Sequence, residues 1–386
     1  MLTSKKRMLT AICGEIPDRL PVTTHHLMTS FLDEYMGGIG DQEFFDHFGM
    51  DAIQWILPLR KIPGVSNVNS GKLAPDWQIP DYVTNDEWQV SIEDVPGFDY
   101  KTKRCTITTP GGNLTLILQG NEHTTWIKEH LIKNKSDIDL LGKYLPLQYC
   151  DVEAVNQAVE SFGERGMIRS YIPGFDLFGQ PGCWQDAACL LGIERLIMET
   201  YDDPGWVHEL LGILHQRKLA YIQSMKGAHF DILELGGGDA STTVISPKIF
   251  HKFVAPYDGE LVSLAHEMGQ RIVYHTCGGM MPILEGLADL GVDAMETFTP
   301  QAMGADVDLA EAKKRIGDRV GMIGGFDQFH FFVGCSPKET RAEVRRCFEA
   351  AGGGGGYIIS PSDHFFEAET ELLHAFVDEA HQCVYV

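Results

Sequence analysis

A histidine and a cysteine two residues apart, His275 and Cys277, are the residues of this sequence with the clearest chemistry. The apolar run Ile-Val-Tyr precedes them and two glycines follow, which predicts a buried strand that stops at a turn. Alternate residues of an extended chain point to the same side, so we expect the imidazole and the thiol to lie together. Such a pair can supply two ligands to a zinc ion, and the remaining ligands must come from elsewhere in the chain.

The elements that would position this pair alternate between strand-like and helix-like patterns. Eight strand-like runs occur, at residues 16–26, 51–57, 167–172, 231–235, 271–277, 293–297, 320–324 and 356–360. Repeated strand–helix units predict parallel strands with right-handed crossovers. Eight units favour an α/β fold of the closed (β/α)8 type, the TIM barrel, over the alternative of an open doubly wound sheet.

Residues 64–130 interrupt this alternation. Pro, Gly, Asn and Asp are frequent there, and two alternating runs, 104–109 and 114–118, flank a Pro-Gly-Gly-Asn turn that predicts a β-hairpin. We interpret 64–130 as a β-rich insertion after the second strand, within a single domain that spans residues 1–386.

In such a barrel, functional groups gather where the strands end. Asp363, His364 or Glu296 could complete a three-ligand metal site with the first pair, which leaves a position open for substrate. Acidic residues at strand ends could orient substrate or carry protons. The predicted catalytic acids are Glu234, Asp239 and Glu296, and the predicted substrate contacts are His25, His26 and Asp327.

The composition narrows the range of partners and compartments. The 386 residues carry a formal net charge of −23, which repels nucleic-acid backbones and anionic lipids. Apolar residues make up 44% of the chain, enough for a large core. The nine scattered cysteines favour a reducing cytoplasm. No secretory signal or membrane-spanning run is predicted.

Three segments of the sequence resemble the uroporphyrinogen decarboxylase superfamily, a (β/α)8 family that includes zinc-dependent, corrinoid-linked methyltransferases. Ile16 to Val22 is similar to its first strand, and Ile245 to Tyr257 is similar to its fourth-helix motif. Tyr274 to Gly278 resembles the His-x-Cys zinc motif of the methyltransferase branch. The resemblance implies zinc as a cofactor, and a corrinoid (cobalamin) carried by a partner protein.

Two departures from the family pattern bear on activity. The decarboxylase branch grips its polycarboxylate substrate with arginines after the first strand, whereas residues 25–32 here contain none. Some methyltransferases of the branch take a third zinc ligand, a cysteine, from just after the eighth strand, where this sequence has Asp363. An oxygen or imidazole ligand would make zinc a harder Lewis acid, suited to an ether or alcohol oxygen.

The sequence therefore favours a zinc-dependent methyltransferase that moves methyl between a small donor or thiol and a corrinoid protein. A uroporphyrinogen decarboxylase is the first alternative, and stoichiometric zinc would argue against it. A non-catalytic barrel that binds a small ligand is the second, and methyl transfer with free cobalamin would argue against that.

Overall fold

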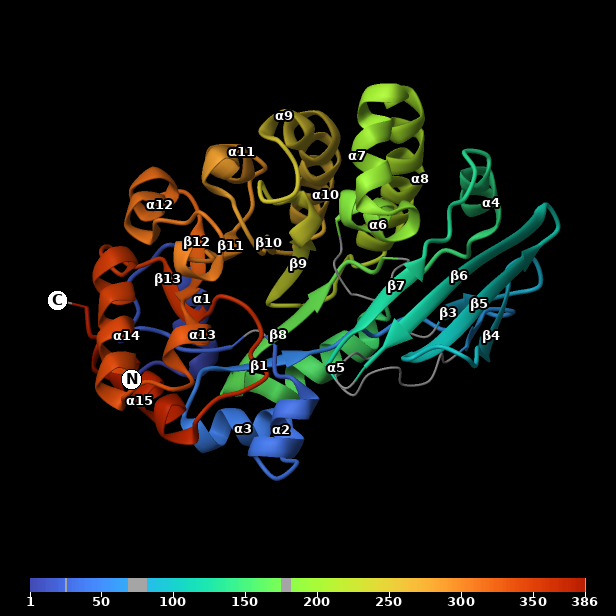
Figure 1. Ribbon diagram of the computed structural model, residues 1–386. Helices are drawn as coiled ribbons and strands as arrows, with labels where there is room; N and C mark the ends of the chain where they lie inside the picture. Colours follow the sequence, from blue (N-terminus) through green and yellow to red (C-terminus); the bar gives the residue numbers. More distant parts are fainter. Residues whose placement is uncertain (25, 69–81, 122, 175–181, 386) are drawn as a thin grey trace.

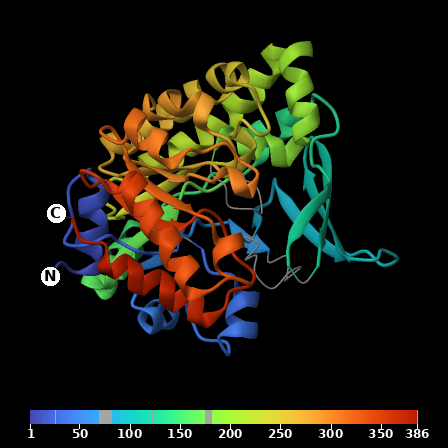
Figure 2. The same ribbon diagram turned by 60° about the vertical axis from the view of Figure 1, so that its left-hand side comes forward.

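A computed structural model describes residues 1–24, 26–68, 82–121, 123–174 and 182–385 (Figure 1). Its centre is a curled sheet of parallel strands, and helices cover the outer face of this sheet (Figures 1 and 2). The strands, in spatial order, are β1 (Ala52–Trp55), β8 (Gly166–Tyr171), β9 (Ile232–Gly236), β10 (Ile272–His275), β11 (Ala294–Thr297), β12 (Gly321–Phe326) and β13 (Tyr357–Pro361). The predicted parallel α/β architecture is confirmed as a TIM-like barrel.

The first predicted strand appears as a single bridge rather than a full strand. Val22 pairs in parallel with Ile359 of β13, and its carbonyl accepts a hydrogen bond from Asp51, next to β1, at 2.7 Å. The segment thus fills the position between β13 and β1. A longer ladder does not form because Pro21 has no N–H and the Val22 N–H donates to the Asp51 carboxylate at 3.0 Å.

The helices follow the strands in the order that the sequence pattern predicts. Three described helices lie between β8 and β9, with breaks at residues 192 and 203. The α-helices are α1 (Ser4–Ile12), α2 (Thr29–Tyr35), α3 (Asp41–Phe48), α4 (Asp137–Tyr144), α5 (Val152–Phe162), α6 (Cys183–Leu191), α7 (Ile193–Asp202), α8 (Pro204–Gln223), α9 (Pro247–Ile249), α10 (Ala255–Glu267), α11 (Leu284–Ala288), α12 (Leu309–Ile316), α13 (Gln328–Phe331), α14 (Pro337–Ala351) and α15 (Thr370–Gln382).

Antiparallel sheets occupy the region between β1 and α4, as predicted for the β-rich insertion, and extend to one side of the barrel (Figure 1). The predicted hairpin is confirmed, with β5 paired to β6 from Lys101↔Gly120 to Thr109↔Gly112. The strands are β2 (Ser66–Val68), β3 (Tyr82–Thr84), β4 (Gln89–Asp94), β5 (Lys101–Thr109), β6 (Gly112–Gly120) and β7 (Thr125–Glu129). The assignment of residues 1–386 to one domain stays a prediction.

We call the end of the sheet where the strands finish the mouth, and the opposite end the base. A group of paired charges, the base cluster, consists of Arg7, Asp18, Arg19 and Asp51. Arg7 donates to Asp18 at 2.8 Å and to Asp51 at 2.6 Å, and Arg19 donates to Asp51 at 3.2 Å. This cluster joins α1 and the first segment to the start of β1. In the described part of the chain, no helix has the length and apolarity that crossing a membrane requires.

Candidate metal centre at the mouth

The His275 imidazole and the Cys277 thiol lie in contact at the mouth. β10 ends at His275, and the chain turns sharply at Gly278, whose φ is +108°. Nε2 of His275 is 2.7 Å from Sγ of Cys277. The preceding side chain, Tyr274, points outward to α10, where its hydroxyl donates to Asp258 at 2.7 Å. The pair thus shares the inward face, as its spacing predicts.

Arg169 of β8 joins two glutamates behind this pair. Its guanidinium donates to Oε2 of Glu234 at 2.6 Å and to Oε2 of Glu296 at 2.9 Å, and it also contacts Oε1 of Glu296. Oε1 of Glu296 is 2.9 Å from Nδ1 of His275. The relative exposures of Arg169, Glu234 and Glu296 are 1%, 3% and 1%, so the group is sealed from water. We call these four residues, with Cys277, the mouth cluster.

Two sides of the His275 ring could face a metal ion. A ligand atom of His275 and one carboxylate oxygen each of Glu234 and Glu296 lie within 4.8 Å of one another, which makes a buried candidate metal site. However, Arg169 already bonds both carboxylates, and a cation there would compete with it. On the other side, Nε2 faces a thiol, the donor pair that suits zinc. The contact of Nδ1 with Glu296 is the kind that orients a zinc-bound histidine.

The protonation of the cluster is set by burial and by its own charges. Burial alone would lower the pKa of His275, but the Cys277 thiolate and the Glu234 carboxylate outweigh it, so the pKa lies well above its ordinary value. Burial raises the pKa of Cys277, and His275 partly offsets this effect. Burial also raises the pKa of Glu234, against the opposing effects of His275 and Arg169. The Nε2–Sγ pair therefore retains a proton that a metal ion would displace.

Asp363 and His364, the predicted third ligands, lie on the loop after β13. Asp363 is close enough to Cys277 to add to the rise in its pKa, although burial is the larger cause. Oδ1 of Asp363 is 3.5 Å from Nδ1 of His364 and accepts the His364 backbone N–H at 2.7 Å. The structure thus brings a carboxylate toward the Cys277 side of the pair. The ligand role of either residue stays a prediction.

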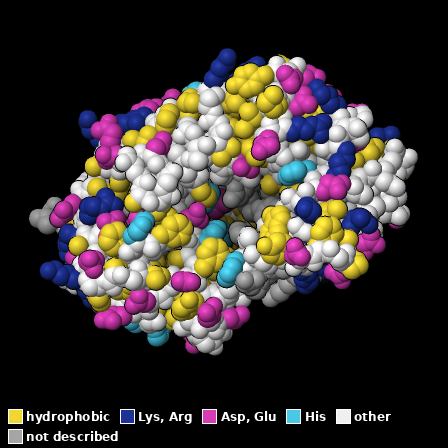
Figure 3. All heavy atoms as spheres, viewed as in Figure 1, with side chains coloured by type: hydrophobic (Ala, Val, Ile, Leu, Met, Phe, Trp, Pro, Cys, Tyr) yellow, Lys and Arg dark blue, Asp and Glu magenta, His cyan; other side chains and the backbone are white. Residues whose placement is uncertain are grey.

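A series of ring contacts connects the loop after β13 with β1 and β8 across the mouth. The ring of His364 meets that of His26 edge-on, at 5.4 Å between centroids. His26 stacks on Trp55, at the end of β1, at 4.8 Å. The Arg169 guanidinium lies over the Trp55 ring at 4.5 Å. In space-filling view, Figure 3 shows a hollow near the middle of this face of the molecule, bordered by hydrophobic and histidine side chains.

The other predicted site residues make different contacts. Asp239 exchanges two hydrogen bonds with Gln185 of α6, at 2.8 and 2.9 Å, and burial raises its pKa. Asp327 caps α13, accepting from the His330 backbone N–H at 3.1 Å and lying 2.8 Å from His330 Nδ1. His25 lies outside the described residues. The catalytic role of Asp239 and the substrate role of Asp327 stay predictions, as do the roles of the other site residues.

Arg169 and Trp55 are the functional candidates that the sequence analysis missed. Arg169 interrupts an apolar strand of which residues 166–170 are all buried. A charge in such a strand must face a buried partner, so its position in the run 167–172 was a usable signal. Trp55 has no comparable signal, because an aromatic residue at a strand end is ordinarily a packing residue.

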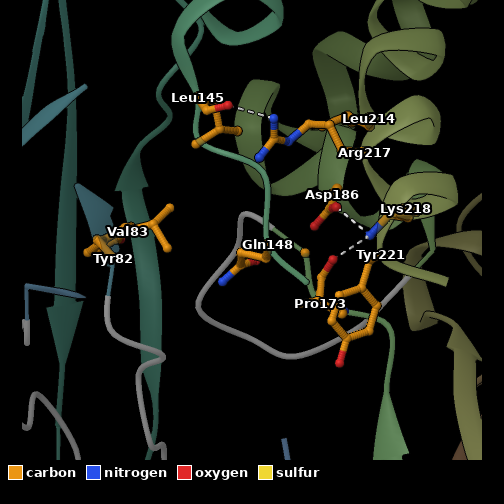
Figure 4. Close-up of a pocket in the computed structure, with 11 residues that line it drawn as sticks. Tyr82, Val83, Leu145, Gln148, Pro173, Asp186, Leu214, Arg217, Lys218 and Tyr221 are labelled. Carbon is orange, nitrogen blue, oxygen red and sulfur yellow. Dashed lines mark hydrogen bonds and ion pairs between the residues drawn. The ribbon is translucent and has the colours of Figure 1, made fainter. Parts of the chain in front are cut away.

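A separate polar cavity of about 50 Å³ lies between the insertion and helices α6 and α8 (Figure 4). Lys218 and Asp186 point toward each other there and form an ion pair of 2.6 Å, with both side chains 2% exposed. Arg217 turns away to the carbonyl of Leu145 at 2.7 Å. This cavity belongs to the helix layer outside the barrel and is lined by none of the mouth cluster.

A TIM-like barrel with possible metal ligands where its strands end is the class of protein that this arrangement defines. The profile of the uroporphyrinogen decarboxylase (URO-D) family matches residues 121–383, and the chain therefore belongs to this family. The uroporphyrinogen decarboxylase of Thioalkalivibrio sulfidiphilus (strain HL-EbGR7) is 28% identical over 192 residues, 47% of this chain and 50% of that protein. That of Cellvibrio japonicus (strain Ueda107) is 27% identical over 264 residues, 65% of this chain and 68% of that protein.

The chain thus spans about half the length of the first of these relatives. Among solved structures, a methyltransferase from Methanosarcina mazei superposes with a TM-score of 0.61 and 16% identity, over 99% of both chains. At that identity the likeness concerns the fold, and it extends over the whole barrel and the insertion.

Proposed function

We propose that the protein is a zinc-dependent methyltransferase that moves a methyl group between a small methyl donor or thiol and a corrinoid on a partner protein. The observation that carries the proposal is the 2.7 Å contact between Nε2 of His275 and Sγ of Cys277, with Nδ1 held by Glu296. An imidazole and a thiol that converge in this way, with the imidazole oriented from behind, are a donor set that fits zinc.

The residues of the mouth would have different roles in holding zinc. His275 and Cys277 would hold the ion, with the Asp363 or His364 side chain as third ligand, and Cys277 gives up its proton on binding. Glu296 would accept from Nδ1 and so direct the lone pair of Nε2 toward the ion, while Arg169 keeps Glu296 in place. Zinc bound here would act as a Lewis acid toward a thiol sulfur or an ether oxygen.

A second candidate is uroporphyrinogen decarboxylation, which the names of the curated relatives support. A substrate with many carboxylates requires cations, and charge-assisted contacts with Arg are its usual recognition. The segment 25–32 lacks arginine, and Arg169 is engaged by two glutamates. We therefore rank decarboxylation below methyl transfer, and a non-catalytic binding barrel below both.

The metal content of untagged protein tests the proposal. We expect about one zinc per chain by atomic emission and a loss of at least 90% of it in Cys277→Ser. Cys335→Ser is the matched control, because Cys335 is also half-buried but contacts Thr340 instead. Full zinc occupancy in Cys277→Ser would exclude this site.

Activity is tested with free methylcobalamin and 2-mercaptoethanol, followed by the absorbance change on demethylation. We expect zinc-dependent turnover that Cys277→Ser abolishes and Cys335→Ser retains. In parallel, anaerobic incubation with uroporphyrinogen should yield no coproporphyrinogen. Steady formation of coproporphyrinogen by the zinc-free protein would replace this proposal with the second candidate.

A further inference from the structure

Three arginines form no ion pair with a described carboxylate, although the chain has 54 acidic residues and only 31 basic ones. They are Arg60, Arg217 and Arg271, and every other arginine is paired with an Asp or Glu. Arg271 lies at the base, directly before β10, whereas Arg60 and Arg217 line two adjoining cavities. On a chain with a net charge of −23, this local excess of positive charge favours an anion.

The larger of the two cavities, of about 550 Å³, lies between the loop after β1, the β2–β3 sheet and the segment before α5. We call it the outer groove. Arg60 and Lys61, both exposed, supply its charge, and the Arg60 guanidinium lies over the Tyr149 ring at 4.6 Å. No Asp or Glu is among its described lining residues. Half of that lining is aliphatic: Leu59, Ile62, Pro63, Val65, Val83 and Leu147.

The smaller cavity, the polar one of about 50 Å³, adjoins the outer groove because Val83 and Gln148 line both. One carboxylate, that of Asp186, is among its described lining residues, and Lys218 pairs with it. The charge of Asp186 is thus already matched within the smaller cavity. It does not offset the charges of the outer groove.

Arg217 adds a further positive charge behind the wall that the two cavities share. Its guanidinium donates to the carbonyl of Leu145 at 2.7 Å (Figure 4) and to that of Pro146. Burial lowers the pKa of Arg217 to about 10, which leaves the group charged at neutral pH. Residues 147–149, which follow these carbonyls directly, line the outer groove. Neutral carbonyls satisfy the N–H groups of Arg217 but do not cancel its charge.

Backbone contacts fix the outer groove beside the insertion. Leu59 forms an antiparallel bridge with Cys150, and the Arg60 N–H donates to the Tyr149 carbonyl at 2.8 Å. The loop that carries Arg60 is therefore held against the segment before α5, so its charge needs little ordering when a ligand binds. No residue of the mouth cluster lines either cavity. A ligand in the outer groove would leave the candidate metal centre unoccupied.

We propose that the outer groove binds an organic anion with an aliphatic body, whose carboxylate or phosphate head contacts Arg60 and Lys61. A guanidinium can bond either head through two N–H groups, and an ammonium adds a point charge. The aliphatic lining would remove the methylene groups of the body from water. A volume of about 550 Å³ is within the range of small-molecule sites. This second site goes beyond the proposed function and does not depend on zinc.

Calorimetry with probes that share one aliphatic chain tests the inference. Octanoate, octyl phosphate, octan-1-ol and octyltrimethylammonium are compared at neutral pH, with butanoate as a short anion. We expect both long anions to bind at one per chain, and the alcohol, the ammonium and butanoate to bind at least roughly tenfold more weakly. The tighter of the two long anions identifies the head group. Equal binding of octan-1-ol or butanoate, tighter binding of the ammonium, or no binding of either long anion would overturn the proposal.

Variants of the arginines locate the binding. Arg60→Gln should weaken both long anions about tenfold and octan-1-ol by less than about threefold, because only the anions lose a charge-assisted contact. Arg60→Lys should restore part of the difference. Arg271→Gln is the matched control, because it removes the same charge from an arginine that also has no described carboxylate partner, and it should change neither affinity. An equal loss for octan-1-ol in Arg60→Gln, or the same loss of anion binding in Arg271→Gln, would contradict recognition of the head.

Cys277→Ser separates the outer groove from the mouth. We expect this variant to bind octanoate as tightly as the unchanged protein does, because Cys277 does not line the groove. A loss of octanoate binding in Cys277→Ser would place the anion at the mouth and overturn the proposal. If octanoate binds as expected while zinc and methylcobalamin turnover are absent, the outer groove stands and the methyltransferase proposal fails.

Discussion

Two groups of paired charges, the base cluster and the mouth cluster, lie at opposite ends of the same barrel and are built differently. The base cluster pairs two arginines with two aspartates and contains neither an imidazole nor a thiol. The mouth cluster uses one arginine for two glutamates and adds an imidazole and a thiol. The first joins chain segments, whereas the second gathers groups whose protonation can change.

The two clusters also shift the pKa values of their acids in opposite directions. At the base, burial alone would raise the pKa of Asp18, but hydrogen bonds from Arg7 and from the Leu2 backbone outweigh it and lower the pKa. At the mouth, burial prevails and raises the pKa of Glu234. A carboxyl group whose ionised form the folded protein favours contributes to stability. A carboxyl group whose ionised form the folded protein disfavours lowers stability, and such groups are typical of functional sites.

Removal of one arginine from each cluster should give the largest effects. Arg169→Met leaves two glutamates buried without their cation, and we expect a loss of about 3–5 kcal/mol in the free energy of unfolding. Arg7→Met leaves Asp51 with Arg19 and the Val22 N–H, so the expected loss is about 1–3 kcal/mol. Urea unfolding at pH 7 measures both.

Arg169→Lys distinguishes charge from geometry, because lysine keeps the cation but cannot bond two carboxylates in the same fixed arrangement. We expect it to recover part of the stability. We also expect zinc affinity about 10- to 100-fold below that of the unchanged protein, since Glu296 then orients His275 less firmly. Equal losses for Arg169→Met and Arg7→Met would contradict the distinction between the clusters.

The fold was largely accessible from the sequence, because strand–helix alternation and the Pro-Gly turn of the β5–β6 hairpin are local signals. The reduction of the first strand to a bridge at Val22 was not accessible. It depends on a carboxylate, Asp51, that lies 29 residues away and takes the N–H that a ladder would use. Local patterns do not reveal this competition between a side chain and a strand.

The site was accessible where its residues are neighbours in sequence. The spacing of His275 and Cys277 predicts their contact because both lie at one strand end. Arg169 was missed because its partner Glu296 is 127 residues away, and the contact of Asp239 with Gln185 spans 54 residues. Strand-end position alone indicates which residues can reach the mouth, but not which residues they contact there.

Neutralisation of Glu234 should distinguish the two possible sides of the metal site. Because burial raises its pKa, the ionised form of Glu234 destabilises the fold at neutral pH, and Gln keeps an oxygen to accept from Arg169. We expect Glu234→Gln to change the free energy of unfolding by less than about 1 kcal/mol. If zinc sits on the Cys277 side, atomic emission will find it retained in Glu234→Gln. A loss of zinc in this variant would place the ion in the Glu234–His275–Glu296 group instead.

Neutralisation of Asp18 should have the smallest effect and a defined pH dependence. The folded protein lowers the pKa of Asp18 below its unfolded value near 3.8, so the carboxylate stabilises the fold above that value. This stabilisation is lost as the pH falls through the lower, folded pKa. We expect Asp18→Asn to cost only about 0.5 kcal/mol at pH 7, because the Asp18 side chain is 27% exposed, and progressively less below pH 4.

Urea unfolding of both proteins from pH 7 down to pH 3 measures this difference. Asp308→Asn is a control for the loss of one carboxylate from a charge of −23, because Asp308 caps α12 away from the base cluster. Because Asp308 lies away from Arg7, the losses in the free energy of unfolding from Asp308→Asn and Arg7→Met should add. Because Asp18 contacts Arg7, Asp18→Asn and Arg7→Met together should cost less than the sum of their separate losses. A difference between Asp18→Asn and the unchanged protein that grows toward pH 3 would contradict the lowered pKa. It would mean that burial governs the acids at both ends of the barrel.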